Sequence, residues 1–219
     1  MGRVYALKSV RVFYKKLDRM KFVSHLDMNR FMSRAIKKAG IPIWYTEGFH
    51  PHPYITFALP LSLGFESEYE IMDIRLTNDD YPLLEVMERL NAVFPEYVRV
   101  FEVCEPETKV GKIGFADFII TFGDSSINSD ELIAFLKRDS IIVSKKTKKG
   151  TLKEIDISEK IKAFSFDNGV LKITLPAGSE DNLNPELLLN EFFENHSSVY
   201  SSYQITRKLV YDTEMNIFR

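Results

Sequence analysis

The sequence contains very little of what several protein classes require. Its 219 residues include one cysteine, Cys104, so the chain can form no internal disulfide and cannot by itself hold a four-cysteine zinc site or an iron–sulfur cluster. The longest uncharged apolar run, residues 54–65, contains a proline and is far shorter than the roughly 20 residues of a membrane-spanning helix. The first residues lack the apolar core of a signal peptide. These absences predict a cytoplasmic protein that does not contact a membrane.

Sequence motifs of several enzyme classes are absent as well. There is no glycine-rich loop ending in Gly-Lys-Ser or Gly-Lys-Thr, no dinucleotide fingerprint, no His-Glu-x-x-His and no Gly-x-Ser-x-Gly. An NTPase, a Rossmann oxidoreductase, a zincin and an α/β-hydrolase are therefore not expected. The sequence predicts no cofactor.

What is present is the composition of a globular protein with an uneven distribution of charge. Hydrophobic residues make up 45% and charged residues 27%, and the formal net charge is -2. Residues 1–60 carry a net charge of +8, residues 61–110 carry -8 and the remainder carries -2. The basic segment is suited to bind an anion, unless the acidic segment folds against it and neutralises it. The sequence leaves both arrangements open.

An amphipathic helix is predicted to begin at Ser24, whose hydroxyl can accept a hydrogen bond from the backbone N–H of Asp27. Gly40 and Pro42 end this helix. Its buried face is predicted to consist of apolar residues at helical spacing, namely Met28, Phe31, Met32, Ala35, Ile36 and Ala39. Basic residues at i, i+4, i+7 and i+8 form a second face, which we call the basic stripe: Arg30, Arg34, Lys37 and Lys38.

Both halves of the chain predict a similar order of strands and helices. In the first half we expect strands over residues 10–14, 43–45, 54–58, 69–76 and 97–103, and helices over 24–39 and 81–94. In the second half we expect strands over residues 115–122, 141–144, 152–157, 170–175 and 203–211, and helices over 129–137 and 184–195. This order predicts an α+β fold of two ferredoxin-like (split βαβ) lobes in tandem, over residues 1–110 and 111–219.

Two further segments favour contacts with nucleic acid. Residues 48–53, Gly-Phe-His-Pro-His-Pro, are predicted to be a stiff extended loop because of the two prolines. Aromatic side chains there can stack on unpaired bases while nearby cations neutralise phosphates, and residues 145–149 predict a basic hairpin tip that makes a second phosphate contact. The candidate nucleic-acid-binding residues are Arg30, Arg34, Lys37, Lys38, Phe49, His50, His52, Lys145, Lys146, Lys148 and Lys149. Core packing of the aromatic residues and a solvated hairpin turn are the alternatives.

A second hypothesis is an enzyme of RNA processing or modification. Its catalytic candidates are His25, Asp27, Glu70 and Asp73, which would have to converge in one pocket to act as acid–base or metal-binding groups. The alternative is that His25 packs at the start of the helix and that His50 and His52 lie on the loop surface. Because His50 and His52 are separated by a proline and followed by another, they are poorly placed to bind one ion, and no metal site is predicted.

Five segments in this order carry a resemblance to a known family: residues 21–27 (Lys-Phe-Val-Ser-His-Leu-Asp), 34–42, 47–53, 61–67 and 70–74. They resemble the radical SAM-linked protein family, a bacterial domain of unknown function that occurs fused to, or encoded beside, radical SAM proteins. The resemblance implies a radical SAM partner and a role near translation or RNA. A chain with one cysteine cannot bind the three-cysteine cluster of radical SAM chemistry, so a separate enzyme would supply the radical.

The leading hypothesis is therefore a non-catalytic accessory module that binds tRNA or rRNA and acts with a separate radical SAM modification enzyme. A third hypothesis is a subunit that docks this partner through the acidic segment 66–107. The sequence leaves the identity of the RNA and the oligomeric state open.

Overall fold

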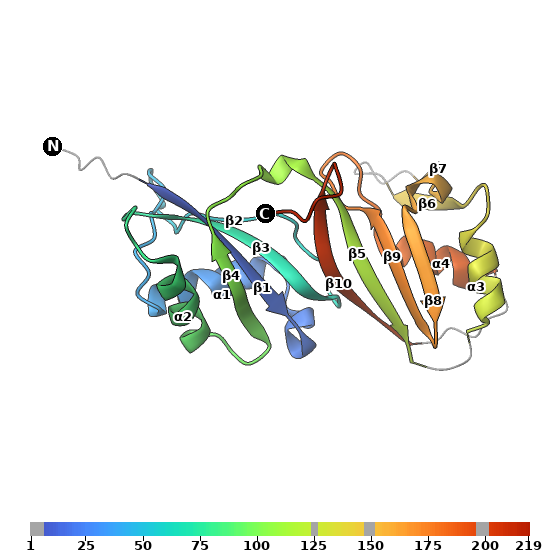
Figure 1. Ribbon diagram of the computed structural model, residues 1–219, viewed down its shortest axis with the longest axis horizontal. Helices are drawn as coiled ribbons and strands as arrows, with labels where there is room; N and C mark the ends of the chain where they lie inside the picture. The colour runs from blue at the N-terminus through green and yellow to red at the C-terminus, as the bar shows by residue number, and fades with distance from the viewer. Residues whose placement is uncertain (1–6, 124–126, 147–151, 196–201) are drawn as a thin grey trace. The chain divides into compact units, whose positions relative to one another are not determined.

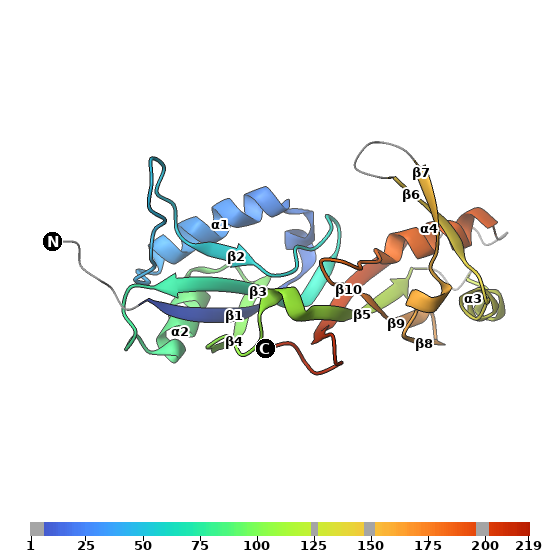
Figure 2. The same ribbon diagram turned by 90° about the horizontal axis from the view of Figure 1, so that it is seen from above.

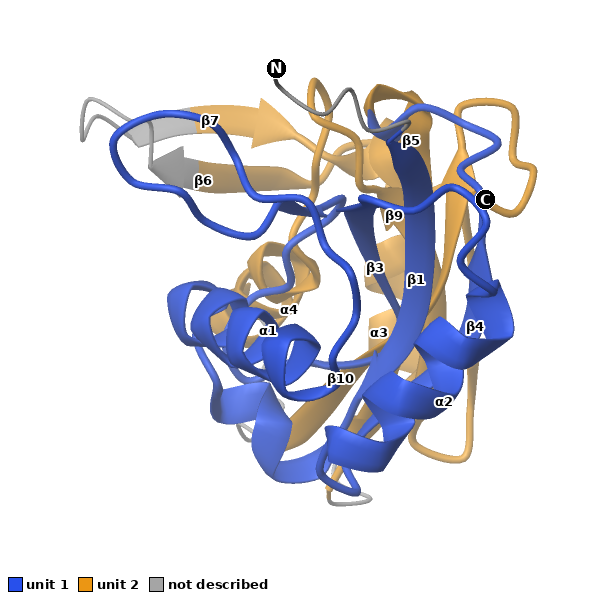
Figure 3. Cartoon of the chain, turned by 90° about the vertical axis from the view of Figure 1, so that its left-hand side faces the viewer, with its two compact units in different colours: residues 1–110, 219 blue, residues 111–218 orange. Residues whose placement is uncertain are grey.

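The computed structural model describes residues 7–123, 127–146, 152–195 and 202–219 (Figure 1). The chain divides into two compact units, residues 1–110 together with Arg219, and residues 111–218 (Figure 3). Both units combine helices with antiparallel strands, so the expected α+β class is confirmed. No helix in the described ranges is long and apolar enough to cross a membrane.

The first unit has one sheet and two longer helices. Its elements are β1 (Lys8–Lys16), a 3-10 helix (Asp18–Phe22), α1 (His25–Lys38), β2 (Ile55–Phe57), β3 (Glu66–Leu76), α2 (Leu83–Val93) and β4 (Val98–Cys104). The strand order is β4-β1-β3-β2, and every neighbouring pair is antiparallel. Strands that are adjacent in this sheet are therefore not adjacent in the sequence, apart from β2 and β3.

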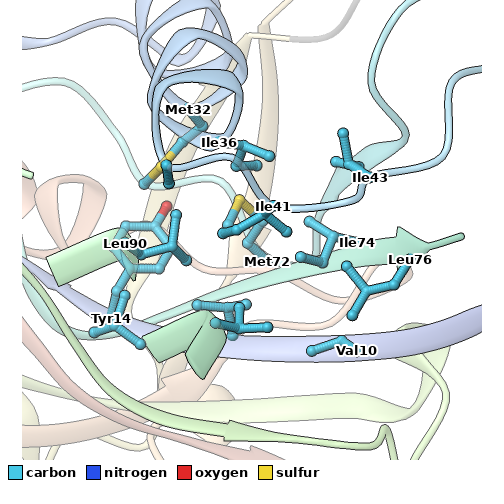
Figure 4. Packing of buried hydrophobic residues seen from close by; sticks show 14 of the residues in the cluster. Val10, Tyr14, Met32, Ile36, Ile41, Ile43, Met72, Ile74, Leu76 and Leu90 are labelled. Carbon is cyan, nitrogen blue, oxygen red and sulfur yellow. The ribbon is translucent and has the colours of Figure 1, made fainter. Parts of the chain in front are cut away.

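The core of the first unit lies between the sheet and its two helices (Figure 4). Side chains alternate between the two faces of a strand, so Val10 of β1 and Met72 of β3 face the helices. Met32 and Ile36 from α1 and Leu90 from α2 pack on them and are fully buried. Each such side chain contributes about 1.5–3 kcal/mol by leaving water. This packing fixes α1 on the sheet and turns the opposite face of the helix outward.

Both ends of α1 lie where the sequence predicts them. The hydroxyl of Ser24 accepts a hydrogen bond from the backbone N–H of Asp27 at 3.2 Å, which caps the first turn. Gly40 follows the helix with φ of +67°, a conformation that other residues adopt only with strain. The prediction of this helix and of its cap is confirmed.

The main strands of the second unit also pair in antiparallel fashion. Its elements are β5 (Ile113–Phe122), α3 (Ser129–Leu136), β6 (Ile142–Lys146), β7 (Leu152–Asp156), β8 (Ala163–Asp167), β9 (Val170–Pro176), α4 (Pro185–Asn195) and β10 (Tyr203–Asp212), with short 3-10 helices at Val110–Lys112 and Ser158–Lys160. The strand order is β10-β5-β9-β8. Strands β6 and β7 pair with each other in a separate two-stranded sheet.

Two details of the predicted strand pattern are wrong. Residues 43–45 form isolated bridges, Ile43 with Leu76 and Tyr45 with Pro53, in place of a continuous strand. The strands expected over residues 141–144 and 152–157 are confirmed as β6 and β7. Strand β8, which was not expected, takes the edge position beside β9.

Candidate functional site

The basic stripe lies on the exposed side of α1, because the apolar residues at helical spacing occupy the opposite face. All four of its side chains are exposed. Arg30 donates a hydrogen bond to Asp27 on the same helix at 3.2 Å. Within the described part of the chain, no acid lies at ion-pair distance from Arg34, Lys37 or Lys38. Most of the positive charge of the stripe is therefore available to a ligand.

Three residues of the stripe line one depression in the surface. It has a volume of about 420 Å³ and is lined by Asp27, Arg30, Phe31, Arg34, Ala35 and Lys38 of α1 and by Val93, the last residue of α2. Its apolar base is held in place by Phe31, whose ring packs on Phe94 with centroids 5.5 Å apart. The charge around the depression is positive, since two guanidinium groups and one ammonium group face a single carboxylate.

The acidic segment 61–110 does not neutralise the basic stripe by ion pairing. Six of its carboxylates pair with cations elsewhere: Glu66 with Lys21, Asp73 with Arg11, Glu85 with Arg89, Glu105 with Lys8, and both Glu102 and Glu107 with Arg219. None of these cations belongs to α1. Of the two arrangements that the sequence left open, ion pairing within the first unit favours the one in which the stripe stays accessible.

Residues 44–54, which we call the tip hairpin, connect α1 to β2 and project on the side of the unit that carries α1 (Figure 2). Its two arms are joined by a bridge between Tyr45 and Pro53 and by a hydrogen bond from the N–H of Thr46 to the carbonyl of His52 at 2.9 Å. Gly48 turns the chain with φ of +126°. At the end of the hairpin the side chain of Phe49 is 100% exposed.

The base of the tip hairpin is built from stacked side chains. The guanidinium of Arg75 lies 4.3 Å from the ring centroid of Tyr54 and 5.8 Å from that of Trp44. The N–H of Trp44 donates to the carbonyl of Arg75 at 2.7 Å. Trp44 and Tyr54 therefore anchor the hairpin on β3, while Phe49 is presented at its end.

The two histidines of the tip hairpin have different surroundings. The Nδ1 of His52 lies 3.0 Å from the hydroxyl of Thr46 and 3.1 Å from the carbonyl of His50, so its ring helps to close the turn. The backbone N–H of His52 also donates to the Thr46 hydroxyl at 3.2 Å. Both histidine side chains are exposed. Among the described residues, no group of three or more His, Cys, Asp or Glu side chains is placed to hold a metal ion.

The four catalytic candidates do not form one site. His25 is exposed, and its ring meets the ring of Phe57 edge-on at 5.2 Å. The hydroxyl of Ser24 donates to the carboxylate of Asp27 at 2.7 Å and, as the main cause, holds the pKa of Asp27 below its usual value. These contacts belong to the start of α1.

Glu70 and Asp73 lie three residues apart on β3, so their side chains leave opposite faces of the sheet. Glu70 is buried, and both carboxylate oxygens of Asp73 accept hydrogen bonds from Arg11. The convergence that the enzyme hypothesis requires is therefore not present in the structure.

The basic hairpin tip of the second unit falls largely outside the described residues. The backbone of Lys145 and Lys146 pairs in β6 with Lys153 and Leu152 of β7. The side chains of Lys145 and Lys146, and all of Lys148 and Lys149, lie outside the described residues. Their proposed contact with phosphate stays a prediction.

The sequence does not single out Arg11 and Arg75, although both line a large cavity of the first unit. Each of them lies in a predicted strand in which charged residues alternate with apolar ones. This alternation is the only local sign that the two side chains lie on the face of the sheet away from the core. Their neighbours in space come from distant parts of the chain, so local sequence gives no sign of the cavity.

Three comparisons relate the chain to known proteins. Residues 9–185 match the family described as "Uncharacterized protein conserved in bacteria (DUF2344)". The comparison with curated proteins gives no match. Among solved structures, a chain of the "Crystal Structure of a Cbf5-Nop10-Gar1 Complex" is similar with a TM-score of 0.49 and 6% identity, over 92% of this chain and 48% of that chain. The match thus spans about half of that chain, and at this level it supports no conclusion about function.

Proposed function

The chain belongs to the uncharacterised bacterial family DUF2344, and we propose that it is an RNA-binding accessory module whose basic helix holds tRNA or rRNA. The observation that carries this proposal is the depression lined by Arg30, Arg34 and Lys38. A rise of 1.5 Å per residue places i and i+4 side chains about 6 Å apart along the helix, so the cations form a regular row. A row of cations is suited to a polyanion, which exchanges several counterions for protein contacts at once.

The tip hairpin supports RNA with unpaired bases as the ligand. The side chain of Phe49 is fully exposed at the end of a hairpin that Arg75, Tyr54 and Trp44 hold in place, so its ring is accessible to a ligand. Stacking of a base on such a ring contributes about 1–3 kcal/mol and does not depend strongly on sequence. His50 and His52 lie beside it and are exposed. We infer that the hairpin contacts bases while α1 contacts phosphates.

We also infer that each unit is a ferredoxin-like split βαβ arrangement, which makes the chain a tandem pair. In the first unit the elements follow the order β1-α1-β2-β3-α2-β4, and the sheet order is β4-β1-β3-β2. The second unit has the same order when β5, β8, β9 and β10 are taken as its four strands, with β6 and β7 as an insertion. Antiparallel four-stranded sheets of this type are common platforms for RNA, which is an analogy at the level of the fold.

The partner that we propose is a separate radical SAM enzyme that modifies the bound RNA. This part rests on the resemblance of residues 21–27, 34–42, 47–53, 61–67 and 70–74 to the radical SAM-linked family. Cys104 is the one cysteine of the chain, so the three-cysteine cluster has to come from the partner. In this arrangement the chain supplies affinity for the RNA and the partner supplies the chemistry.

Charge reversal on α1 tests the RNA-binding proposal. We expect Arg30→Glu with Arg34→Glu to weaken the binding of bulk tRNA or rRNA at low salt by at least tenfold, measured by filter binding. The matched control is Lys112→Glu with Lys137→Glu, because both lysines are exposed and lie outside α1. Circular dichroism and a melting curve check that both double variants fold. Equal affinity of both variants and the wild type, or no RNA binding by the wild type at low salt, would overturn the proposal.

A further inference from the structure

The large cavity of the first unit lies on the face of the sheet opposite the helices. It has a volume of about 950 Å³, within the range of about 300–1,000 Å³ of small-molecule sites. Strand register sets its floor: Arg11 of β1 pairs with Asp73 of β3, and Thr56 of β2 pairs with the same residue from the other side. Directly opposite residues of neighbouring strands share a face, so these side chains point to one surface. Residues 105–110 form one wall.

A buried ion pair forms the centre of this floor. Arg11 is 1% exposed, and its Nε and Nη2 donate to the two carboxylate oxygens of Asp73 at 2.7 and 2.8 Å. Its Nη1 donates to the carbonyl of Thr108 at 2.8 Å, which holds the wall segment against the sheet. A buried ion pair is often no more stabilising than apolar residues of the same volume. Both residues of the pair line the cavity, so the pair is placed where a ligand can contact it.

Asp73 can accept further hydrogen bonds from a ligand. Each carboxylate oxygen has two lone-pair sites, and Arg11 uses one on each oxygen. The side chain of Asp73 is 19% exposed, whereas Arg11 is almost fully enclosed. A group in the cavity that carries N–H donors can therefore bond to the carboxylate, whose orientation Arg11 fixes.

The other walls supply a flat stacking surface and cations. The guanidinium of Arg75 lies over the ring of Tyr54 at 4.3 Å, so two planar groups border the cavity as a stacked pair. Bases of RNA stack on such guanidinium and aromatic planes. Lys109 lies at the edge, where its ammonium group can bind a phosphate, whereas Lys8 is paired with Glu105 at 3.3 Å. The cavity thus combines an acceptor for N–H groups, a stacking surface and cations.

One ligand class matches all three features, since a nucleotide has N–H donors on its base edge, a flat ring and a phosphate. We propose that this cavity binds one unpaired nucleotide of the RNA, swung out of its stack, and this proposal rests on the RNA-binding function above. The cost of unstacking a base is a few kcal/mol and is smallest in loops and single strands. A free nucleotide has the same chemistry, so the experiment has to separate the two sources.

The test uses the full chain and two kinds of probe. The first is the set of four nucleoside 5′-monophosphates, titrated by calorimetry. The second is a single-stranded RNA with one 4-thiouridine, crosslinked by light and mapped by peptide sequencing. We expect at least one monophosphate to bind and to be displaced by the RNA, and we expect crosslinks in the segments that line the cavity. Arg75→Ala and Lys109→Glu should each weaken the binding of the monophosphate by about tenfold.

Two variants keep this result separate from the proposed function. Because Arg75 also anchors the tip hairpin, Lys109→Glu serves as the variant that leaves the hairpin base intact. Arg30→Glu with Arg34→Glu should weaken RNA binding and leave monophosphate binding unchanged. If RNA binding needs α1 but crosslinks avoid the cavity and no monophosphate binds, the cavity proposal is wrong and the RNA-binding function stands. If a monophosphate binds but RNA does not displace it, the claim that the bound nucleotide belongs to the RNA is wrong, and the cavity is a site for free nucleotides.

Discussion

Ser24 and Asp27 fix the first turn of the basic helix. The Ser24 hydroxyl accepts from the N–H of Asp27 and donates to the Asp27 carboxylate at 2.7 Å, and Asp27 in turn accepts from Arg30. An acid in the first turn also interacts favourably with the positive end of the helix. These three side chains are therefore engaged in starting α1.

Replacement of Ser24 tests this role at the level of one residue. We expect Ser24→Ala to lower the free energy of unfolding by about 1 kcal/mol, the usual loss for removal of an N-cap. The pKa of Asp27 should rise at the same time, because its main hydrogen-bond donor is gone. Urea denaturation measures the first change, and an NMR titration of the carboxylate measures the second.

Ser33→Ala is the matched control for this substitution. Ser33 lies inside α1, where alanine is the better helix former, so this change should leave stability unchanged or raise it by a few tenths of a kcal/mol. Equal losses of stability in the two variants would show that the cap does not contribute.

At the scale of single elements, the sequence predicted α1 well because its signals are local. The cap at Ser24, the spacing of Met28, Met32 and Ile36, and the stop at Gly40 all lie within the helix or next to it. The tip hairpin was harder to predict. Arg75, which stacks on Tyr54, lies more than 20 residues further along the chain, and the prolines predicted a stiff extended loop over residues 48–53.

The strands of the second unit also show that contacts between distant segments cannot be predicted from local sequence. The segment Ala163–Asp167 alternates small or polar residues with Phe164 and Phe166, a pattern typical of a strand with one buried face. Local sequence predicted the strands β6 and β7 and the hairpin tip between them, but nothing in it indicates that this pair lies apart from the main sheet. Strand formation is local, whereas the choice of partner depends on the whole unit.

Asp156, the last residue of β7, makes the stability of the β6–β7 hairpin depend on pH. Its carboxylate accepts from the N–H groups of Ile141 and Ser158 at 3.0 and 2.9 Å and from the Ser158 hydroxyl at 2.8 Å. Hydrogen bonding, first from the hydroxyl of Ser140, holds the pKa of Asp156 far below its usual value near 3.8. A lowered pKa in the folded state stabilises the fold above the unfolded pKa, and this stabilisation is lost as the pH falls.

We therefore expect the wild type to lose stability between about pH 5 and pH 2 more steeply than Asp156→Asn, whose amide does not titrate. Unfolding by urea at a series of pH values measures the slope. Glu159→Gln, an exposed acid in the adjacent turn, is the control and should keep the wild-type slope. Parallel curves for the wild type and Asp156→Asn would contradict the assignment.

At the scale of the whole molecule, the net charge of -2 is a poor guide to function. The acids of residues 61–110 pair with cations such as Lys8, Arg11 and Arg219, and these pairs leave the row of cations on α1 without acidic partners from that segment. The row itself was predictable because helical spacing is a local property. The cavity was not, since Arg11 and Asp73 are 62 residues apart and meet only through strand pairing.

An accessible row of cations predicts a measurable dependence of RNA binding on salt. If all four basic side chains of the stripe contact phosphates, the logarithm of the affinity should fall linearly with the logarithm of the salt concentration. The slope should be about -2.8 for single strands and about -3.6 for duplexes. Lys38→Ala should reduce the magnitude of this slope by about 0.7–0.9 and weaken binding to all sequences alike, because Lys38 lines the depression and pairs with no acid among the described residues.

Lys137→Ala is the control that shows whether the salt dependence arises from α1, since Lys137 is an exposed lysine at the end of α3. This variant should keep the wild-type slope. If both variants change the slope equally, the positive charge acts diffusely over the surface, and α1 is not the segment that holds the RNA. If only Lys38→Ala changes the slope, Lys38 contacts a phosphate of the RNA, because removal of a lysine lowers the number of released counterions only where that lysine neutralises a phosphate.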